Sequence, residues 1–461
     1  MRFAANVLGW LRGPMRRIAA PVLAAAAAVG GLAQCATQAA EWDVGPGKQF
    51  ARIEDAVARA ADGDIVRVFP LEGGRAYEKT AVFVRQKRLT IRGMPAQAGQ
   101  RVAIDGKGFD YSGRGSTPRA IFQFNPGTDD CLLENFELFG AKNQSHNGAG
   151  VRINQANNVV IRNCSIHDND MGIMSNGDGS LERGRNQLIE YCEVFRNGTT
   201  ADPGKNHNLY LGGSSVTVRA CHIHGSTTGH NFKSRAHFNR VEYCYIHSSA
   251  NREFDLVDAV ETTRPGSHTL LLANVIAKDP KCAGNRAVVH FGQDGGREHD
   301  GTLHLYFNTI VTPFIAPVVE LSSPKSSATL VGNLIVDGSG RQAGQVLVAA
   351  RAGAAIDRVS GVFNGLAGSF AAPDAAIDIE SQRIASPKGG WFIAPDRHDY
   401  RLTAEAARVA VFRGSLNLLK LPAGSETTNP PEPLLKWRYL HPAQREARPA
   451  DSSGLLGAMG R

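Results

Sequence analysis

A short pattern of apolar and polar positions recurs along the middle of the chain. Apolar residues occupy its first and sixth positions, and its fourth position is usually small or polarizable. The copies are LENFEL (133–138), IRNCSI (161–166), IEYCEV (189–194), VRACHI (218–223), VEYCYI (241–246), LLLANV (270–275), LYFNTI (305–310) and LVGNLI (330–335). Each copy predicts a short strand of a parallel sheet with one buried face.

The spacing between the copies predicts how these strands are arranged. Successive fourth positions are 28, 28, 29, 23, 29, 35 and 25 residues apart, and they are occupied by Phe136, Cys164, Cys192, Cys221, Cys244, Ala273, Asn308 and Asn333. A nearly constant strand that returns after connections of variable length is typical of a coil in which like residues stack. The 461 residues therefore favour one repeat structure over several compact domains.

Cysteine usage fits the same coil. One of the seven Cys, Cys35, lies in a predicted leader, and the even number that remains would ordinarily suggest disulfides in an oxidising compartment. However, Ala and Asn stand at the same position in other copies, which favours a packing role for the stacked Cys. The chain has no CxxC pair, so a zinc site built on Cys is not predicted.

The segment before the first copy predicts the start of the coil. Residues 42–69 read as a strand, a Gly-rich turn, a helix and the strand DIVRVFP (64–70), followed by LTIRG (89–93), VAIDG (102–106) and AIFQF (120–124). The helix carries one apolar stripe, formed by Ile53, Ala56, Val57 and Ala60. We expect it to cover the open first turn.

This opening resembles the start of pectate-lyase-like proteins. The resemblance implies an all-β fold, a single-stranded right-handed parallel β-helix with an N-terminal capping helix and a C-terminal cap and tail. We expect the β-helix to span residues 41–340. The repeat fades afterwards, so residues 341–461, which include DYRLT (399–403) and TNPPEP (428–433), are expected to form the last turns, a cap and an extended tail.

Residues 1–40 have the layout of a signal peptide. Basic Arg12, Arg16 and Arg17 precede an apolar run from Ile18 to about Leu32, and small residues follow. The run is shorter than the roughly 20 apolar residues of a spanning helix, so we expect cleavage near residue 39 or 40, no transmembrane segment, and a periplasmic or secreted protein. A lipid-anchored start at Cys35 is the less favoured alternative.

Composition narrows the partners. The chain is 42% hydrophobic and 20% charged, which fits an ordered protein. Its net charge of +8 falls to +4 when the four Arg of the signal are removed. A mildly basic protein suits an acidic polymer such as a polysaccharide, whereas no Lys/Arg run or basic patch with interleaved aromatic residues predicts nucleic-acid binding. We expect a monomer.

Two turns align without a gap at a spacing of 23 residues. They are NHNLYLGGSSVTVRACHIHG (206–225) and GHNFKSRAHFNRVEYCYIHS (229–248). Neighbouring strands lie about 4.8 Å apart, so aligned residues should be neighbours in space. The aligned pairs are His207 and His230, Asn208 and Asn231, Tyr210 and Lys233, Gly212 and Arg235, Cys221 and Cys244, and His224 and His247.

Strand alternation divides these residues between two faces. It places Leu209, Leu211, Phe232 and Ser234 inside. It places Asn208, Tyr210, Asn231, Lys233 and Arg235 on the solvent face, and Gly212 leaves open surface beneath Arg235. His207 and His230 begin their strands beside a turn, where alternation does not decide their direction.

The outward residues suit cleavage of an acidic sugar by β-elimination. In that reaction a base removes the proton beside the carboxylate, the carboxylate is neutralised, and an acid protonates the leaving oxygen. Lys233 is the candidate base, provided that its neighbours lower its pKa. Arg235 or His230 would neutralise the carboxylate, and Tyr210 would protonate the leaving oxygen.

Further residues would bind the substrate. Asn208, Asn231 and His207 lie next to the candidate catalytic residues in the aligned turns, and Arg152 and His290 would extend the groove on either side. The alternative is a plain sheet surface, on which Lys, Arg and Tyr are common and Asn satisfies turn backbone. The gathering of several polar groups on two turns favours a site.

The segment GHNFKSR (229–235) also resembles the Lys- or Arg-bearing strand of alginate lyase and chondroitinase-B-type enzymes, and the His-bearing strand of β-helical alginate epimerases. The resemblance implies that Lys233 and Arg235 act on the sugar ring with His230 beside them. The chain departs from those families because it has no evident DPHD box, which counts against epimerisation and against alginate as substrate.

Two groups of residues in the sequence could bind a metal ion. The segment REFDLVDAVET (252–262) carries acidic residues that could bind a calcium ion bridging to a substrate carboxylate: Glu253, Asp255, Asp258 and Glu261. The alternative is salt bridging to Arg235 or Arg252. Three imidazoles that follow the apolar position of their repeats, those of His167, His224 and His247, could also bind metal, but Phe195 interrupts their row and favours simple stacking.

These observations lead to a main hypothesis and its alternatives. The main hypothesis is an exported lyase acting on a uronic-acid-containing polysaccharide. The alternatives are a uronate C5-epimerase and a non-catalytic carbohydrate-binding or polymer-export β-helix. A hydrolase of the polygalacturonase type is disfavoured because its paired outward Asp residues have no evident counterpart other than DND (168–170).

Overall fold

The computed structural model describes residues 39–338, 343–370, 381–416, 419, 422, 435–450 and 454–460. The predicted signal peptide, apart from its last two positions, lies outside the described residues, and so does TNPPEP (428–433). Within the described residues, no helix has the length and apolar character needed to span a membrane. The predicted boundaries of the β-helix stay a prediction.

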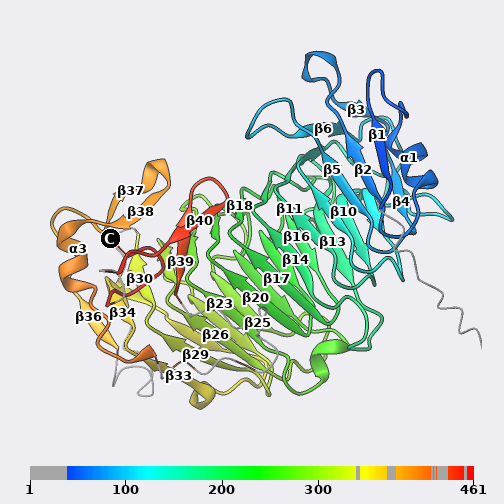
Figure 1. The fold of residues 1–461 in the computed structure, drawn as a ribbon. Coiled ribbons are helices and arrows are strands. Elements are labelled where there is room, and N and C mark those ends of the chain that lie inside the picture. The colour runs from blue at the N-terminus through cyan, green and yellow to red at the C-terminus, as the bar shows by residue number, and fades with distance from the viewer. Residues whose placement is uncertain are drawn as a thin grey trace, which may run out of the picture. The chain divides into compact units, whose positions relative to one another are not determined.

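Three long parallel sheets make up most of the structure (Figure 1). Sheet A contains β1 (Glu41–Val44), β2 (Ile65–Val68), β5 (Thr90–Gly93), β8 (Leu132–Glu134), β11 (Val160–Arg162), β14 (Gln187–Glu190), β17 (Ser215–Arg219), β20 (Phe238–Glu242), β23 (Thr269–Leu272), β26 (Thr302–Tyr306), β29 (Ser327–Val331) and β33 (Val359–Val362). Sheet B contains β3 (Tyr77–Glu78), β6 (Val102–Asp105), β9 (Phe136–Phe139), β12 (Ser165–His167), β15 (Glu193–Phe195), β18 (His222–His224), β21 (Tyr245–His247), β24 (Val275–Ala277), β27 (Thr309–Thr312), β30 (Leu334–Asp337), β34 (Gly365–Ala367) and β36 (Gln382–Ile384). Sheet C contains β4 (Val82–Val84), β7 (Ala120–Phe124), β10 (Ala149–Asn154), β13 (Met171–Asn176), β16 (Leu209–Leu211), β19 (Phe232–Ser234), β22 (Phe254–Val257), β25 (Val289–Gly292), β28 (Val319–Ser322) and β32 (Val348–Ala350).

The order of these strands makes the chain a coil. From β2 to β34, apart from β31, the chain enters sheets A, B and C in turn and then repeats the cycle, and strands that are one turn apart pair in parallel. The predicted early strands correspond to β2, β5, β6 and β7. The parallel β-helix predicted from the repeats is confirmed.

Each copy of the six-residue pattern is a bend rather than one strand. In the first copy, β8 ends at Glu134 and β9 begins at Phe136, and Asn135 between them has φ of 68°. The equivalent Asn163, Tyr191 and Tyr243 have φ of 48°, 56° and 54°. The expectation of one strand for each copy is therefore wrong, because a left-handed third residue turns the chain from sheet A into sheet B.

The predicted row also shifts by one residue at its sixth copy. Leu271 pairs with Val241, which places Asn274, not Ala273, beside Cys244. Ala273 instead is the left-handed residue of the bend, with φ of 51°. The sequence pattern misled because Leu270 and Leu271 fit the apolar first position equally well, so that Ala273 and Asn274 were equally possible at the fourth.

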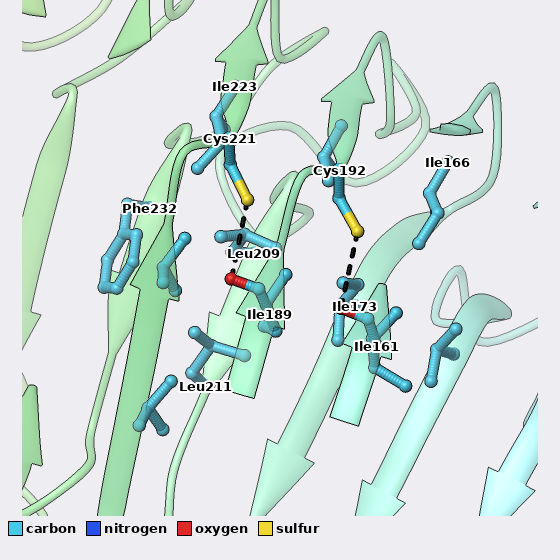
Figure 2. Packing of buried hydrophobic residues seen from close by; sticks show 14 of the residues in the cluster. Ile161, Ile166, Ile173, Ile189, Cys192, Leu209, Leu211, Cys221, Ile223 and Phe232 are labelled. Atoms are coloured by element: carbon cyan, nitrogen blue, oxygen red, sulfur yellow. Dashed lines mark hydrogen bonds between the residues drawn. The ribbon is translucent and has the colours of Figure 1, made fainter. Parts of the chain in front are cut away.

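The row of fourth positions is a hydrogen-bonded ladder inside the coil. The backbone N–H of Cys164 donates to the Sγ of Cys192 at 3.4 Å, and that of Cys221 donates to the Sγ of Cys244 at 3.4 Å. The thiols of Cys192 and Cys221 point to the backbone oxygens of Ile161 and Ile189, as Figure 2 shows. All six cysteines of the described chain are buried and free, which confirms the packing role.

Asparagines continue this ladder toward the C-terminus. The N–H of Cys244 donates to Asn274 Oδ1 at 2.9 Å, and each later rung repeats the contact, through Asn308, Asn333 and Asn364. The Nδ2 groups of these Asn donate to backbone oxygens and to the next Asn. Every rung therefore satisfies a backbone group at the bend.

The remaining elements lie outside the three sheets. They are α1 (Ile53–Arg59), α3 (Ala404–Val409), the 3-10 helices η1 (Glu72–Gly74), η2 (Glu261–Thr263), η3 (Ile356–Arg358) and η4 (Pro395–Arg397), and the strand pairs β31 (Ala343–Gln345) with β35 (Ser369–Phe370), β37 (Phe392–Ala394) with β38 (Asp399–Leu402), and β39 (Trp437–Leu440) with β40 (Gln444–Ala447). The predicted stripe of α1 is buried in the interior cluster of the coil. Its role as a cap stays a prediction.

The C-terminal segments pack against the outer face of sheet B. Tyr400 and Tyr439 form one buried apolar cluster with Tyr245 of β21. Arg445 Nε donates to Tyr191 Oη at 3.2 Å, and the N–H of Ala458 donates to Thr309 Oγ1 at 3.0 Å. The tail residues are thus fixed to turns that lie far earlier in the sequence.

Candidate functional site

Sheet C carries one continuous row of outward side chains. Tyr210 of β16 pairs with Lys233 of β19, Lys233 with Asp255 of β22, and Asp255 with His290 of β25. Arg152 of β10 belongs to the same row, separated from Tyr210 only by Met174. The gapless alignment of the two central turns is confirmed, and it brings Tyr210 beside Lys233 as predicted.

Opposite charges link the middle of this row. Lys233 Nζ lies 2.8 Å from Asp255 Oδ2 and 2.8 Å from Asp294 Oδ2. Arg235 NH2 lies 2.7 Å from the same oxygen of Asp294. At the other end, His290 Nδ1 lies 2.8 Å from Asp255 Oδ1. A chain of hydrogen-bonded polar side chains therefore runs from His290 to Arg235.

The surroundings of Lys233 do not suit a base. Burial on its own lowers the pKa of the Lys233 ammonium, but Asp255 and Asp294 outweigh burial, and the pKa is raised above its usual value. A charged ammonium has no lone pair with which to accept a proton. The condition set for Lys233 as the base, a lowered pKa, is not met in this geometry.

Tyr210 lies beside Arg235 in a cleft. Arg235 Nε donates to Tyr210 Oη at 3.1 Å, and Arg235 NH1 donates to the backbone oxygen of Asp258. The cleft has a volume of about 740 Å³, and both Gly212 and Arg235 line it. Lys233 does not line this cleft.

Four arginines and three carboxylates line the cleft, so its formal charge is mildly positive. The arginines are Arg119, Arg152, Arg235 and Arg297, and the carboxylates are those of Asp178, Asp258 and Glu261. Arg152 NH2 donates to Asn176 Oδ1 at 3.3 Å, and Arg119 NH2 donates to the backbone oxygen of Ser112 at 3.4 Å. The described residues place no carboxylate in ion-pair distance of the guanidinium groups of Arg119, Arg152 or Arg297. These cations are thus available to an anionic ligand.

Asn208 and Asn231 do not face solvent, so the prediction of their outward direction is wrong. Both side chains are 0% exposed. Asn208 Nδ2 donates to Asn231 Oδ1 at 2.8 Å, and Asn231 Nδ2 donates to Glu253 Oε2 at 2.7 Å. They precede β16 and β19 at a bend, where alternation no longer holds, and form rungs of a second interior ladder that also contains Asn169 and Asn197. Buried side chains of this kind have no surface to offer a sugar.

His207 and His230 stack on each other just before the same strands. Their ring centroids are 5.1 Å apart, and both residues are buried. The Nδ1 of His207 accepts from the N–H of His230 at 3.0 Å, and the Nδ1 of His230 accepts from the N–H of Arg252 at 3.2 Å. Burial lowers the pKa of His230 to about 4, so its imidazole is neutral at neutral pH and cannot neutralise a carboxylate as a cation.

Of the four acidic residues proposed for calcium, Glu253 accepts a hydrogen bond from Asn231, and the other three have separate partners. Asp255 is engaged by Lys233, His290 and Arg252. Asp258 accepts hydrogen bonds from the N–H groups of residues 294, 295 and 297, and Glu261 accepts one from the N–H of Gly179 at 3.0 Å. Among the described residues these carboxylates do not converge into a shared group of ligands, and calcium binding stays a prediction.

A family model agrees with the coil. Residues 124–276 match the family model described as the right handed beta helix region. The fold is a right-handed parallel β-helix. Two solved structures are similar to the chain. "Crystal structure of pectate lyase Pel9A" has 13% identity, covers 92% of this chain and 97% of that chain, and has a TM-score of 0.47. "The complex structure of XylC with xylose" has 11% identity, covers 75% of this chain and 70% of that chain, and has a TM-score of 0.39. No curated protein matches the sequence.

Three residues of the β-helix site were missed from the sequence. Asp294 joins Lys233 to Arg235, and Arg119 and Arg297 line the cleft. Asp294 and Arg297 lie in the Gly-rich segment after β25, where no periodic pattern indicates direction. Arg119 directly precedes β7. It could have been predicted only from the position of β7 in the same sheet as β16, three turns earlier.

Proposed function

We propose that this β-helix is a lyase that cleaves a uronic-acid-containing polysaccharide by β-elimination in the cleft beside Tyr210. The observation that carries the proposal is the hydrogen bond from Arg235 Nε to Tyr210 Oη at 3.1 Å inside a cleft lined by arginines. The hydrogen bond fixes the position of the phenol oxygen, which can exchange a proton with a group bound in the cleft. The arrangement combines a proton-transfer group with groups that bind an anion.

In this proposal the substrate is bound by the arginines that have no ion-pair partner among the described residues. Arg152 lies in the outward row of sheet C, on β10. Arg119 directly precedes β7, the strand that pairs with β10. Guanidinium groups bind carboxylates in a bidentate manner. A polymer with a carboxylate on successive sugars would therefore lie along sheet C, across the ends of several turns.

Tyr210 carries the proton in this proposal. The phenolate removes the proton from the carbon next to the sugar carboxylate, and the electron pair of that C–H bond forms a carbon–carbon double bond as the bond to the leaving oxygen breaks. Tyr210 then donates the same proton to the leaving oxygen. Arg235 and Arg152 hold the carboxylate and offset the charge that develops on it.

Lys233 has a positioning role in this scheme instead of the role of base. It is held between Asp255 and Asp294, and Asp294 also binds Arg235. A fixed Asp294 keeps the guanidinium of Arg235 in the orientation in which its Nε reaches Tyr210. Lys233 therefore acts on the reaction through Arg235.

The proposal includes export, because a polymer-degrading enzyme meets polysaccharide outside the cytoplasm. It rests on the sequence of residues 1–40, with a basic start, an apolar run and small residues before position 40. Fractionation of cells that produce the full chain, with N-terminal sequencing of the exported form, tests it. A cytoplasmic protein that retains Met1 would contradict it.

A panel of acidic polysaccharides tests the activity. Each polymer is incubated with the protein, with and without added calcium, and the ultraviolet absorbance of unsaturated uronate is followed. Absorbance that grows with wild type and not with Tyr210→Phe supports the proposal. Inverted sugar residues without cleavage, seen by proton NMR, would indicate an epimerase, and binding without either change would indicate a carbohydrate-binding protein; both outcomes contradict the lyase.

A further inference from the structure

A cluster of five histidines lies on sheet B, a different sheet from the one that bears the cleft. Three come from the coil: His222 and His224 from β18 and His247 from β21. Two come from the C-terminal segments: His398 follows η4, and His441 lies between β39 and β40. Three stretches of chain that are far apart in the sequence thus contribute imidazoles to one place.

The coil supplies its three imidazoles from two adjacent rows. His224 and His247 stack at a centroid distance of 5.0 Å, in a row that continues through Phe195 to His167 and confirms the predicted stacking. His222 lies in the neighbouring row, with its ring 4.1 Å from that of His224 and 5.1 Å from that of His247.

The nitrogens of these three rings converge. One ligand atom of each of His222, His224 and His247 lies within 4.8 Å of those of the other two. The Nε2 atoms of His222 and His247 are 2.9 Å apart. Zinc–nitrogen bonds of about 2.0–2.1 Å place tetrahedral ligands about 3.3 Å from one another, so small side-chain movements would bring these atoms around one ion.

A carboxylate supports two of the rings. Glu193 Oε1 lies 3.2 Å from His222 Nδ1 and 3.3 Å from His224 Nε2. A carboxylate that holds one nitrogen of an imidazole and leaves the other for a metal ion is the usual support of a histidine ligand. For His222 this arrangement leaves Nε2, the atom that faces His247.

The C-terminal segments bring two more imidazole rings next to the three of the coil. The ring of His441 lies 4.9 Å from that of His222, and the ring of His398 lies 5.3 Å from that of His247. The Nδ1 of each is bonded to a tyrosine hydroxyl, Tyr245 for His398 at 3.2 Å and Tyr439 for His441 at 3.1 Å. The Nε2 atoms of both rings have no hydrogen-bond partner among the described residues.

We propose that this cluster is a binding site for a transition-metal ion that prefers imidazole ligands, of which Zn²⁺ is the test ion. His222, His224 and His247 supply three ligands, and a fourth comes from His398 or His441. Stacking along the coil accounts for the pair His224 and His247. It does not account for the convergence of His222 on that pair, or for the two further imidazoles that the tail brings beside these rings with their Nδ1 atoms already engaged.

The ion would join the tail to the coil. Without it, the tail is held by apolar packing and by a few hydrogen bonds such as the one between Arg445 and Tyr191. A bond from His398 or His441 to a metal held by three coil residues adds a crosslink between segments more than 150 residues apart in the sequence. An ion that binds only the folded arrangement stabilises it by mass action.

The test uses the untagged mature chain after removal of metal with a chelator. Titration with Zn²⁺, followed by calorimetry and by metal analysis of the dialysed protein, is expected to give one ion per chain and a higher Tm. Co²⁺ added to the wild type is expected to give the visible absorption of a tetrahedral nitrogen site, a measurement that needs no variant. Absence of Zn²⁺ binding, or a Co²⁺ spectrum identical to that of the free ion, would overturn the proposal.

Variants locate the site. His222→Ala is expected to abolish Zn²⁺ binding, and Glu193→Gln to weaken it by about 10–100-fold. His167→Ala, which removes a ring of the same stack beyond Phe195, is the matched control and should bind Zn²⁺ as wild type does. Binding that survives in His222→Ala, or that is lost equally in His167→Ala, would contradict the assignment.

Discussion

The guanidinium of Arg235 is fixed against the hydroxyl of Tyr210. Its Nε lies 3.1 Å from Tyr210 Oη, its NH2 lies 2.7 Å from Asp294 Oδ2, and its NH1 bonds the backbone oxygen of Asp258. All of its nitrogens thus have a partner, which leaves the side chain little freedom to turn away from the phenol. A preorganised cation of this kind needs no rearrangement when charge develops on the oxygen beside it.

Removal of the Tyr210 hydroxyl is expected to abolish proton transfer and spare binding. In Tyr210→Phe, kcat on the responsive acidic polysaccharide should fall by about 10²–10⁴-fold, with KM close to that of wild type. Tyr191→Phe, which alters a tyrosine bonded to Arg445 outside the cleft, is the control and should keep its rate. Initial rates from the absorbance of unsaturated uronate provide the measurement.

Lys233 is expected to act on stability and position. Lys233→Ala leaves Asp255 and Asp294 without their shared cation, so the free energy of unfolding should fall by about 3 kcal/mol. Lys233→Arg should restore most of that loss and retain the wild-type pH–rate profile, because a guanidinium serves as a cation but not as a base. Denaturant unfolding and pH–rate curves give the comparison. A Lys233→Arg variant that folds normally without turnover would restore Lys233 as the base.

Arg152 is expected to contribute mainly to substrate binding. Arg152→Ala should raise KM for an acidic polymer about tenfold or more, as loss of a charged hydrogen bond would. The salt dependence of KM should become weaker in the variant, because one fewer cation contacts the polymer. Arg114→Ala, an exposed arginine that does not line the cleft, is the control. An unchanged KM in Arg152→Ala would place the polymer elsewhere.

Asn231 is expected to affect stability without touching substrate. Asn231→Ala removes the acceptor of Asn208 Nδ2 and the donors to Glu253 Oε2 and to the backbone oxygen of His247. Each buried group left without a partner costs about 1–3 kcal/mol. Polymer affinity of the folded variant should equal that of wild type. A variant of normal stability with weaker polymer binding would reverse our placement of Asn231.

Acid should destabilise the protein in part through His299. Burial lowers the pKa of His299 from 6.5 to about 4 in the folded chain, so the unfolded chain binds more protons between these values. The stability that a neutral His299 provides is therefore complete above pH 6.5 and is lost as the pH falls toward 4, by roughly 1.4 kcal/mol for each pKa unit. His299→Gln should show a shallower loss in unfolding experiments across this range. Parallel curves for the two proteins would contradict the assignment.

Much of the fold could be predicted because the interior of the coil repeats. The apolar positions and the row from Cys164 to Cys244 predicted where successive turns of the coil lie, because like residues stack when strands pair in register. The bends could not be recognised, because residues such as Asn135 and Tyr191 are left-handed without being Gly. Their conformation is supported by contacts with neighbouring turns that no single repeat contains.

The site could be predicted where alternation applies and not beyond it. Tyr210 and Lys233 lie within strands, so their direction followed from their position. Asn208 and Asn231 precede their strands, where a bend turns them into the interior ladder. Asp294 lies in a loop after β25, and its position depends on three backbone N–H groups that bind Asp258. Such contacts between turns have no signature in the sequence of either turn.

The ladder of fourth positions has a direction. The backbone N–H of each rung is satisfied by a side chain from the following turn, as Asn274 is by Asn308 and Asn308 by Asn333. A deletion that removes part of a turn would leave the backbone N–H of one rung without its side-chain acceptor. Removal of a whole turn would instead place that N–H beside the acceptor of the next remaining rung. Although its connections vary in length, the coil can therefore gain or lose strands only in complete turns, and each added turn must bring its own Asn or Cys.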